Sequence, residues 1–421
     1  AAILPFYESI SKNAYNKLGT RIIYSLPIRA LARGVYDEFK SFGITPVIHH
    51  GEEPESNLFS ERAIITTVDQ YFTAFAGAPL SWGARQSHAV AGASLTSYTV
   101  FDEVHLLNPK NGLQLLFAIL RLRDRWALPT TVMTATLPDS VINFLVFNCG
   151  LKKVEASNKD VGERDSWREV NLTLHNNEMN ITDLSNFIKE KYNNCRKIIT
   201  FINTVDRAIK LYKELDKDSL LRNRILLSHS RFAREDRKGI EDKIHQKFGK
   251  NSKFEGILVT TQVAEAGLNI SAPLIVTELS PMDSIIQRAG RCARFREDSK
   301  NVKGEIVVVK PKSEGEREWF APYFDYIYLR RDRKKNEAFI RNKERISLSE
   351  LTWLVLLEKS QSSIILRWDT EKGLLNLTLH DPYYTFINGS ETLYFEDLRN
   401  KEIGSIIEKH RDKLDEDKLG G

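Results

Sequence analysis

Short apolar runs rich in β-branched residues alternate along the chain with longer segments whose apolar residues recur every three or four positions. The first pattern is typical of buried strands and the second of amphipathic helices. We expect strands at 21–25, 45–49, 63–67, 98–101, 131–134, 170–174, 197–201, 224–227, 256–260, 274–277 and 305–309. We expect helices at 29–42, 111–122, 181–192, 204–215 and 234–248. The alternation predicts an α/β fold built on parallel sheets.

A polar, weakly periodic segment at 156–167 separates the two sets of expected strands. We therefore expect a first α/β domain at 1–155, a linker at 156–167 and a second α/β domain at 168–310. The pattern changes after residue 310, where charged helical and short strand-like segments follow a loop-like run. This change predicts a small C-terminal α+β extension at 311–421.

The composition is that of an ordinary globular protein, with 42% hydrophobic and 28% charged residues. These values exclude a disordered or collagen-like chain. No apolar run is long enough for a transmembrane helix, and the first residues lack the basic region of a secretory signal, so we expect a cytoplasmic protein with no membrane partner. Cys149, Cys195 and Cys292 are too few and too dispersed for a disulfide framework, a zinc site or an iron–sulfur cluster.

The net charge of +5, from 61 basic and 56 acidic residues, is mild for a nucleic-acid-binding protein. The positive charge is concentrated at 329–345, where eight Lys or Arg residues stand among three Asp or Glu residues. Such a cluster suits a phosphate backbone, and it is equally typical of a solvated helix face. The charge alone leaves both interpretations open.

Two adjacent carboxylates, Asp102 and Glu103, follow the expected strand at 98–101. Open parallel sheets bind ligands at the carboxyl ends of their strands. At such an edge, one carboxylate can hold Mg²⁺ through water while the other polarises an attacking water. A bare Asp-Glu pair is more often a solvated loop, so this interpretation depends on the other motifs of the chain.

A run of polar and basic residues at 287–294 supplies a second candidate site. If this run is helical, Gln287, Arg291 and Arg294 share one face, where the two guanidinium groups can bind a triphosphate. The alternative is an ordinary basic helix face. Gly290 argues against that alternative, because glycine is unfavourable inside a helix unless another group must approach closely.

In order and spacing, several runs resemble the conserved motifs of superfamily-2 helicases, and most of all the helicase part of the type I CRISPR-associated nuclease–helicase family. The runs that carry the resemblance are DEVH at 102–105, TATLP at 134–138, SHSRF at 228–232, TTQVAEAGLNIS at 260–271 and TELSPMDSIIQRAGRCAR at 277–294. The resemblance covers about residues 1–310 and implies two tandem RecA-like domains with ATP and Mg²⁺ as cofactors.

The resemblance also implies roles for individual residues. The residues implied in catalysis are Asp102, which also holds Mg²⁺ through water, Glu103, Gln287, Arg291 and Arg294. Those implied in coupling hydrolysis to domain movement are His105, Thr134 and Thr136, and those near the nucleotide are Gly267 and Asn269. Those implied in nucleic-acid binding are Arg29, Thr67, Gln70, His229, Arg231 and Thr261.

Three features depart from the family pattern. Asn269 stands where the family often has aspartate, although an amide also hydrogen-bonds a ribose hydroxyl. No GxxxxGK[ST] phosphate loop occurs, so we expect the chain to start just after that loop and to be inactive alone. His380 and Asp381 have too few histidines nearby for a nuclease metal site, so we expect the nuclease on another segment or subunit.

The resemblance thus implies an ATP-dependent single-stranded DNA translocase, or helicase, of CRISPR interference. By resemblance, its partners are single-stranded DNA, an HD-type nuclease domain or subunit, and a crRNA-guided surveillance complex. We expect Asp102 and Arg291 to face each other across a gap sized for a triphosphate. The alternatives are a DEAH-like RNA helicase or repair translocase, and a non-catalytic nucleic-acid docking module.

Overall fold

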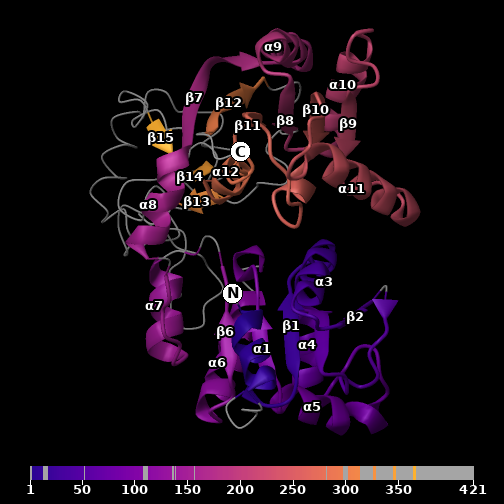
Figure 1. Cartoon of the computed structure of the whole chain (residues 1–421), viewed down its shortest axis with the longest axis vertical. Helices are drawn as coiled ribbons and strands as arrows, with labels where there is room; N and C mark the ends of the chain where they lie inside the picture. Colours follow the sequence, from indigo (N-terminus) through magenta and orange to yellow (C-terminus); the bar gives the residue numbers. More distant parts are fainter. Residues whose placement is uncertain are drawn as a thin grey trace. The chain divides into compact units, whose positions relative to one another are not determined.

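The chain folds into two compact units, Ala1–Val154 and Glu155–Gly421, in a computed structural model (Figure 1). The structure describes residues 2–12, 18–51, 53–107, 112–134, 137, 139–155, 157–280, 282–296, 302–312, 326–328, 345–347 and 364–366. Within these residues, no helix is both long and apolar enough to cross a bilayer.

The first unit is built on a six-stranded sheet with the strand order β3-β2-β4-β1-β5-β6. Its strands are β1 (Ile22–Leu26), β2 (Val47–His50), β3 (Glu53–Pro54), β4 (Ala63–Thr67), β5 (Tyr98–Phe101) and β6 (Thr130–Val132). All neighbouring strands are parallel except β3, which pairs antiparallel with β2. Every residue of β1, β4 and β5 is buried, as expected for parallel strands covered on both faces.

The helices of the first unit precede, connect and follow these strands. They are α1 (Ile3–Ser11), α3 (Ala32–Ser41), α4 (Val68–Phe75), α5 (Ser87–Leu95), α6 (Gln114–Arg125) and α7 (Asp139–Asn148), with short 3₁₀ turns η1 (Arg29–Leu31), η2 (Ala84–Gln86) and η3 (Val104–Leu106). Because β1, β4, β5 and β6 run parallel, their carboxyl ends lie along one edge of the sheet.

The second unit is built on a seven-stranded sheet with the order β15-β7-β12-β11-β8-β10-β9. Its strands are β7 (Arg168–Met179), β8 (Lys197–Phe201), β9 (Ile225–Ser228), β10 (Gly256–Thr260), β11 (Leu274–Glu278), β12 (Val302–Pro311) and β15 (Ile364–Leu366). Among the described strands of this sheet, β15 pairs antiparallel with β7, and the other neighbouring strands are parallel. The helices are α8 (Asn158–Trp167), α9 (Ile181–Asn194), α10 (Val205–Asp216), α11 (Arg234–Phe248) and α12 (Met282–Ala289), with the 3₁₀ turn η5 (Gln262–Ala264).

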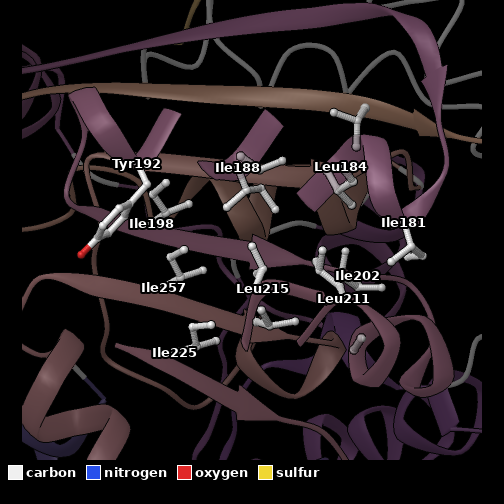
Figure 2. Close-up of a cluster of buried hydrophobic side chains, with 14 of the residues drawn as sticks. Ile181, Leu184, Ile188, Tyr192, Ile198, Ile202, Leu211, Leu215, Ile225 and Ile257 are labelled. Carbon is white, nitrogen blue, oxygen red and sulfur yellow. The ribbon is translucent and has the colours of Figure 1, made fainter. Parts of the chain in front are cut away.

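Helices α9 and α10 pack their apolar faces on this sheet, as Figure 2 shows. Leu184 and Ile188 of α9 and Leu211 of α10 lie over Ile198 of β8 and Ile257 of β10, and all five side chains are at most 1% exposed. Asn180 begins α9 with a capping box, in which its side chain accepts from the backbone of Asp183. The periodic pattern and the cap together explain why this helix starts where it does.

The expected α/β fold with two parallel sheets is confirmed. Strands β4, β5, β8 and β10 and helix α11 occupy the ranges that the sequence predicts. Helix α8 lies within the segment expected as a linker. Most of the expected C-terminal extension lies outside the described residues. Among the residues of this extension that are described, β13 (Tyr326–Tyr328) and β14 (Arg345–Ser347) pair antiparallel. The proposed domain boundaries stay a prediction.

Candidate functional site

The two carboxylates of the DEVH run lie at the carboxyl edge of the first sheet. The backbone N–H of Asp102 donates to the carbonyl of Ser25 in β1 at 3.0 Å, which extends the ladder by one residue beyond β5. On the other side, the N–H of Val104 donates to the carbonyl of Met133, just after β6, at 3.3 Å. These bonds hold the turn after β5 between its two neighbouring strands, where a parallel sheet offers its ligand-binding edge.

The carboxylate of Asp102 is held by two donors. Tyr24 Oη donates to Oδ2 at 2.7 Å, and the backbone N–H of Glu103 donates to Oδ1 at 2.8 Å. Burial raises the pKa of Asp102, and the bond from Tyr24 acts against that rise. Burial likewise raises the pKa of Tyr24, so its phenol stays a donor. Each Asp102 oxygen keeps a further lone pair, so this half-buried carboxylate can also accept from a metal-bound water.

Glu103 adopts a left-handed backbone conformation, with φ 51° and ψ 38°. This conformation is strained for a residue with a side chain, and such strain is most often found at functional turns. It turns the chain from β5 into η3 and places the Glu103 carboxylate beside the imidazole of His105, with Oε2 3.4 Å from Nδ1.

His105 connects Glu103 with the segment that follows β6. Its Nδ1 also lies 3.3 Å from Oγ1 of the exposed Thr134. The side chain of His105 is 5% exposed, and burial lowers its pKa to about 4, so the imidazole is neutral at neutral pH. The structure thus brings together Asp102, Glu103, His105 and Thr134, whereas Thr136 lies outside the described residues.

The residues expected to contact a nucleic-acid strand in the first unit lie at the same sheet edge. Arg29 is exposed in η1, and its Nη2 lies 3.7 Å from the position that a Cβ on Gly51 would occupy. Thr67 precedes α4 and Gln70 lies in its first turn, and both side chains are 5% exposed. Arg29 is therefore the one of these three that presents its side chain outward.

In the second unit, the run at 260–271 leads from β10 through η5 to Gly267, whose φ of 85° favours glycine. Thr261 is buried and Asn269 is exposed. Directly after the neighbouring strand β9, the ring of His229 stacks on Phe232, with the ring centroids 4.1 Å apart. Thr261 and His229 thus directly follow the carboxyl ends of the adjacent parallel strands β10 and β9.

His229 is also fixed by hydrogen bonding, because the N–H of Arg231 donates to its Nδ1 at 3.2 Å. Burial lowers the pKa of His229. Arg231 itself forms an ion pair with Asp206, and both side chains are largely exposed.

The condition under which Gln287, Arg291 and Arg294 would share one helix face is not met. Helix α12 ends at Ala289, and Arg291 and Arg294 follow the helix rather than continue it. The physical reason is local: Gly290 is followed by a tight turn in which Ala293 has a φ of 45°.

Arg168 at the start of β7 stabilises this helix end. Its guanidinium donates to the carbonyls of Ala289, Cys292 and Ala293 at 2.6–3.2 Å. The carbonyl groups that a longer helix would use internally are thus satisfied by a side chain from another element.

Arg291 is 9% exposed and is turned toward the run that follows β10. Its Nε donates to the carbonyl of Ala264 at 3.3 Å, and its Nη2 donates to the carbonyl of Glu265 at 2.7 Å. Arg294 and Gln287 are half-buried, and the backbone N–H of Arg294 donates to Ser271 Oγ at 2.9 Å. The two candidate runs of the second unit are therefore directly bonded to each other.

Sequence reasoning missed a buried polar network beneath these runs. Arg288 donates to Glu265 at 2.8 Å, to Thr277 Oγ1 at 2.6 Å and to Asn203 Oδ1 at 3.3 Å. Glu278, fully buried in β11, accepts from the N–H of Asn203 at 2.8 Å and pairs with Arg207 at 2.8 Å. A carboxylate inside the apolar run of β11 was the available signal, because a buried charge requires a partner.

Comparison with known families shows which proteins this chain resembles. Residues 1–144 match the family model described as DEAD/DEAH box helicase. Residues 194–297 match a second model, described as CRISPR-associated nuclease/helicase Cas3, C-terminal. Together with the two parallel sheets and the DEVH turn, these matches support the ATP-dependent helicase class.

Individual curated proteins show which helicases this chain resembles. The chain is 28% identical over 333 residues to a putative CRISPR-associated nuclease/helicase Cas3 of Methanocaldococcus jannaschii, an alignment that covers 68% of this chain and 43% of that protein. It is 28% identical over 249 residues to the CRISPR-associated endonuclease/helicase Cas3 of Escherichia coli, covering 52% and 28% respectively. The resemblance to a Cas3-like helicase is confirmed, and the chain spans less than half the length of these relatives.

Solved structures show the same fold. The T. fusca Cas3–AMPPNP structure matches with a TM-score of 0.62 and 19% identity, covering 93% of this chain and 50% of that one. A chain in a structure described as a CRISPR RNA-guided surveillance complex, pre-nicking, matches with a TM-score of 0.60 and 19% identity, covering 97% and 51%.

Proposed function

We propose that this chain is the motor part of an ATP-driven translocase that moves along single-stranded DNA in CRISPR interference. The observation that carries the proposal is the bonded chain Tyr24–Asp102 and Glu103–His105–Thr134 at the carboxyl edge of the first sheet. It joins the candidate metal-binding and water-aligning carboxylates to the segment after β6. The similarity to Cas3 proteins gives the biological setting.

The donor set of the site fits a nucleotide-bound Mg²⁺ rather than a metal held by protein alone. Within the described residues, no group of three or more His, Cys, Asp or Glu side chains forms a metal site. Mg²⁺ is commonly held by one or two carboxylates together with waters and substrate phosphates, and there it neutralises phosphate charge. Asp102, with its oxygens oriented by Tyr24 and by the Glu103 N–H, supplies that carboxylate.

In the proposed mechanism, Glu103 aligns the attacking water and accepts its proton. Neutral His105 couples Glu103 to Thr134, because its Nδ1 contacts both side chains. Arg291 and Arg294 neutralise developing charge on the γ-phosphate, and Gln287 is a further proposed member of this catalytic set. For Arg291 this requires release from the carbonyls of Ala264 and Glu265. Gly267 and Asn269 lie near the nucleotide.

The proposed contacts with the DNA strand are Arg29, Thr67, Gln70, Thr261, His229 and Arg231. Contact through phosphates alone suits a motor that moves over any sequence. We further propose an HD-type nuclease domain or subunit and a crRNA-guided surveillance complex as partners. The 421-residue chain contains no GxxxxGK[ST] run, so by itself it should hydrolyse ATP slowly.

The test is Glu103→Gln in the full-length protein. We expect the loss of DNA-stimulated ATP hydrolysis with unchanged affinity for single-stranded DNA. Glu8→Gln, at an exposed position of α1, is the matched control and should keep wild-type turnover. Unchanged turnover in Glu103→Gln would exclude the assignment. Stimulation by RNA alone would favour the RNA helicase, and binding without any turnover in the wild type would favour the docking module.

A further inference from the structure

Trp82 lies in the segment between α4 and α5 and stacks on His49 of β2. The two ring centroids are 4.4 Å apart with an angle of 10° between the planes. Phe59 meets both rings edge-on, at 5.1 Å from Trp82 and 5.4 Å from His49. His49 and Phe59 are fully buried, whereas Trp82 stays partly exposed. His49 and Phe59 thus fix the orientation of the Trp82 indole, which still contacts solvent.

Two further contacts attach this segment to the sheet edge where the expected nucleic-acid contacts Thr67 and Gln70 lie. Ser81 Oγ donates to Gln70 Oε1 at 3.0 Å, so the residue before Trp82 is tied to the first turn of α4. His49 pairs in register with Thr66 of β4, whose Oγ1 donates to the His49 carbonyl at 2.7 Å. Trp82 therefore sits over the carboxyl ends of β2 and β4, where Thr67 and Gln70 lie.

The exposed residues around Trp82 combine apolar and cationic character. Leu80 is 62% exposed, and Arg85 is exposed three residues after Trp82. Arg29 is exposed at the same edge, beside Gly51, which directly follows β2. An aromatic side chain next to exposed guanidinium groups is the combination that holds unpaired nucleotides, because every base has a π face and every nucleotide carries a phosphate.

We propose that Trp82 is a stacking platform for an unpaired base of the bound strand, next to a phosphate contact made by Arg29. The proposal rests on the proposed function and adds a base contact to a set of expected phosphate contacts. Because His49 and Phe59 already hold the indole in one orientation, stacking needs little further ordering of the side chain. Sequence preference is not required, since stacking tolerates every base.

The test compares a normal and an abasic strand. In the full-length protein, Trp82→Leu keeps an apolar side chain against His49 but removes the aromatic face. We expect about fivefold to tenfold weaker binding of oligo(dT), measured by fluorescence anisotropy, and near-wild-type binding for Trp82→Phe. For a strand with abasic sites in place of thymidine, wild type and Trp82→Leu should bind equally.

Trp126→Leu is the matched control. Trp126 is 51% exposed and follows α6, at the edge of the same sheet where β6 begins, opposite the candidate site. This variant should bind both strands as the wild type does, and circular dichroism checks that both variants fold. Equal loss for both strands in Trp82→Leu, or no loss for oligo(dT), overturns the proposal. If the wild type binds neither strand, the proposed function itself fails and the inference falls with it.

Discussion

Arg288 Nη2 lies 2.6 Å from Glu265 Oε1, and the arginine side chain is fully buried. Arg288 belongs to α12, whereas Glu265 follows η5 in the run after β10, 23 residues earlier in the chain. The pair therefore holds together the two runs of the second unit that resemble helicase motifs. Neighbouring Arg291 bonds the same run through its backbone carbonyls, so two arginine side chains hold the two runs together.

Arg288→Met should strongly destabilise the second unit. Removing one partner of a buried ion pair leaves the other charge without compensation, which costs about 3–5 kcal/mol. Urea unfolding followed by circular dichroism measures the loss. Arg224→Met is the control, because Arg224 pairs with Glu255 at the surface, where solvent screening leaves such pairs little net effect on stability. Equal shifts for the two variants would contradict this account.

Arg123→Lys should destabilise the first unit even though the charge is retained. The buried guanidinium of Arg123 donates to Thr130 Oγ1, to Tyr71 Oη and to three backbone carbonyls, at 2.7–3.1 Å. A lysine ammonium cannot reach acceptors spread around a planar fork, and each buried acceptor left without a donor costs about 1–3 kcal/mol.

Thermal denaturation measures this loss. The control is Arg125→Lys, two residues along the same helix, where the side chain is exposed and the expected change is within about 0.5 kcal/mol. A wild-type midpoint for Arg123→Lys would show that the five hydrogen bonds contribute little.

Much of the fold could be predicted because its signals are local. Strands β4 and β8 are short β-branched runs, and α11 has a helical period over its whole length, so hydrophobic pattern alone placed them. The turn after β5 was predictable for the same reason, since a polar pair directly follows a buried strand. These elements need no knowledge of what packs against them.

The second-unit site could not be predicted in the same way. Its arrangement depends on partners distant in sequence: Arg168 binds the end of α12 across more than 120 residues, and Arg288 selects Glu265 and Asn203. Spacing alone suggested a shared face only if the run at 287–294 were helical, but the helix ends at Ala289, before Gly290, and Arg168 binds carbonyls at that end. The hydrophobic pattern predicts which faces of an element are apolar. It does not predict which buried charged side chains contact each other.

Arg291→Ala should lower both stability and activity. Its guanidinium satisfies the buried carbonyls of Ala264 and Glu265, so removal should cost about 1–3 kcal/mol in urea unfolding without any nucleotide present. In the full-length protein, loss of a charge-neutralising arginine should reduce DNA-stimulated ATP hydrolysis by about 10³-fold or more. Exposed Arg222→Ala is the control for both measurements. Unchanged hydrolysis would remove Arg291 from the proposed catalytic set, whatever the change in stability.

Stability of the first unit should fall as pH decreases, through His49. Burial lowers the pKa of His49 to about 4 from the ordinary value of 6.5, with Glu61 acting against this shift and His50 adding to it. Between these two values the unfolded chain binds a proton that the folded chain does not, so unfolding becomes more favourable as pH falls. The free energy of unfolding is not reduced by His49 protonation above about pH 6.5, and it is lowered by about 3 kcal/mol at pH 4.

The substitution His49→Phe isolates this contribution, because phenylalanine keeps a ring against Trp82 and cannot bind a proton. Urea midpoints of wild type and variant are compared from pH 7 to pH 4. The difference between the two proteins should change by about 3 kcal/mol over that range, in favour of the variant at low pH. His105, which is also neutral at neutral pH, titrates in both proteins and cancels in the comparison. Parallel pH profiles would show that His49 is protonated equally in the folded and unfolded states.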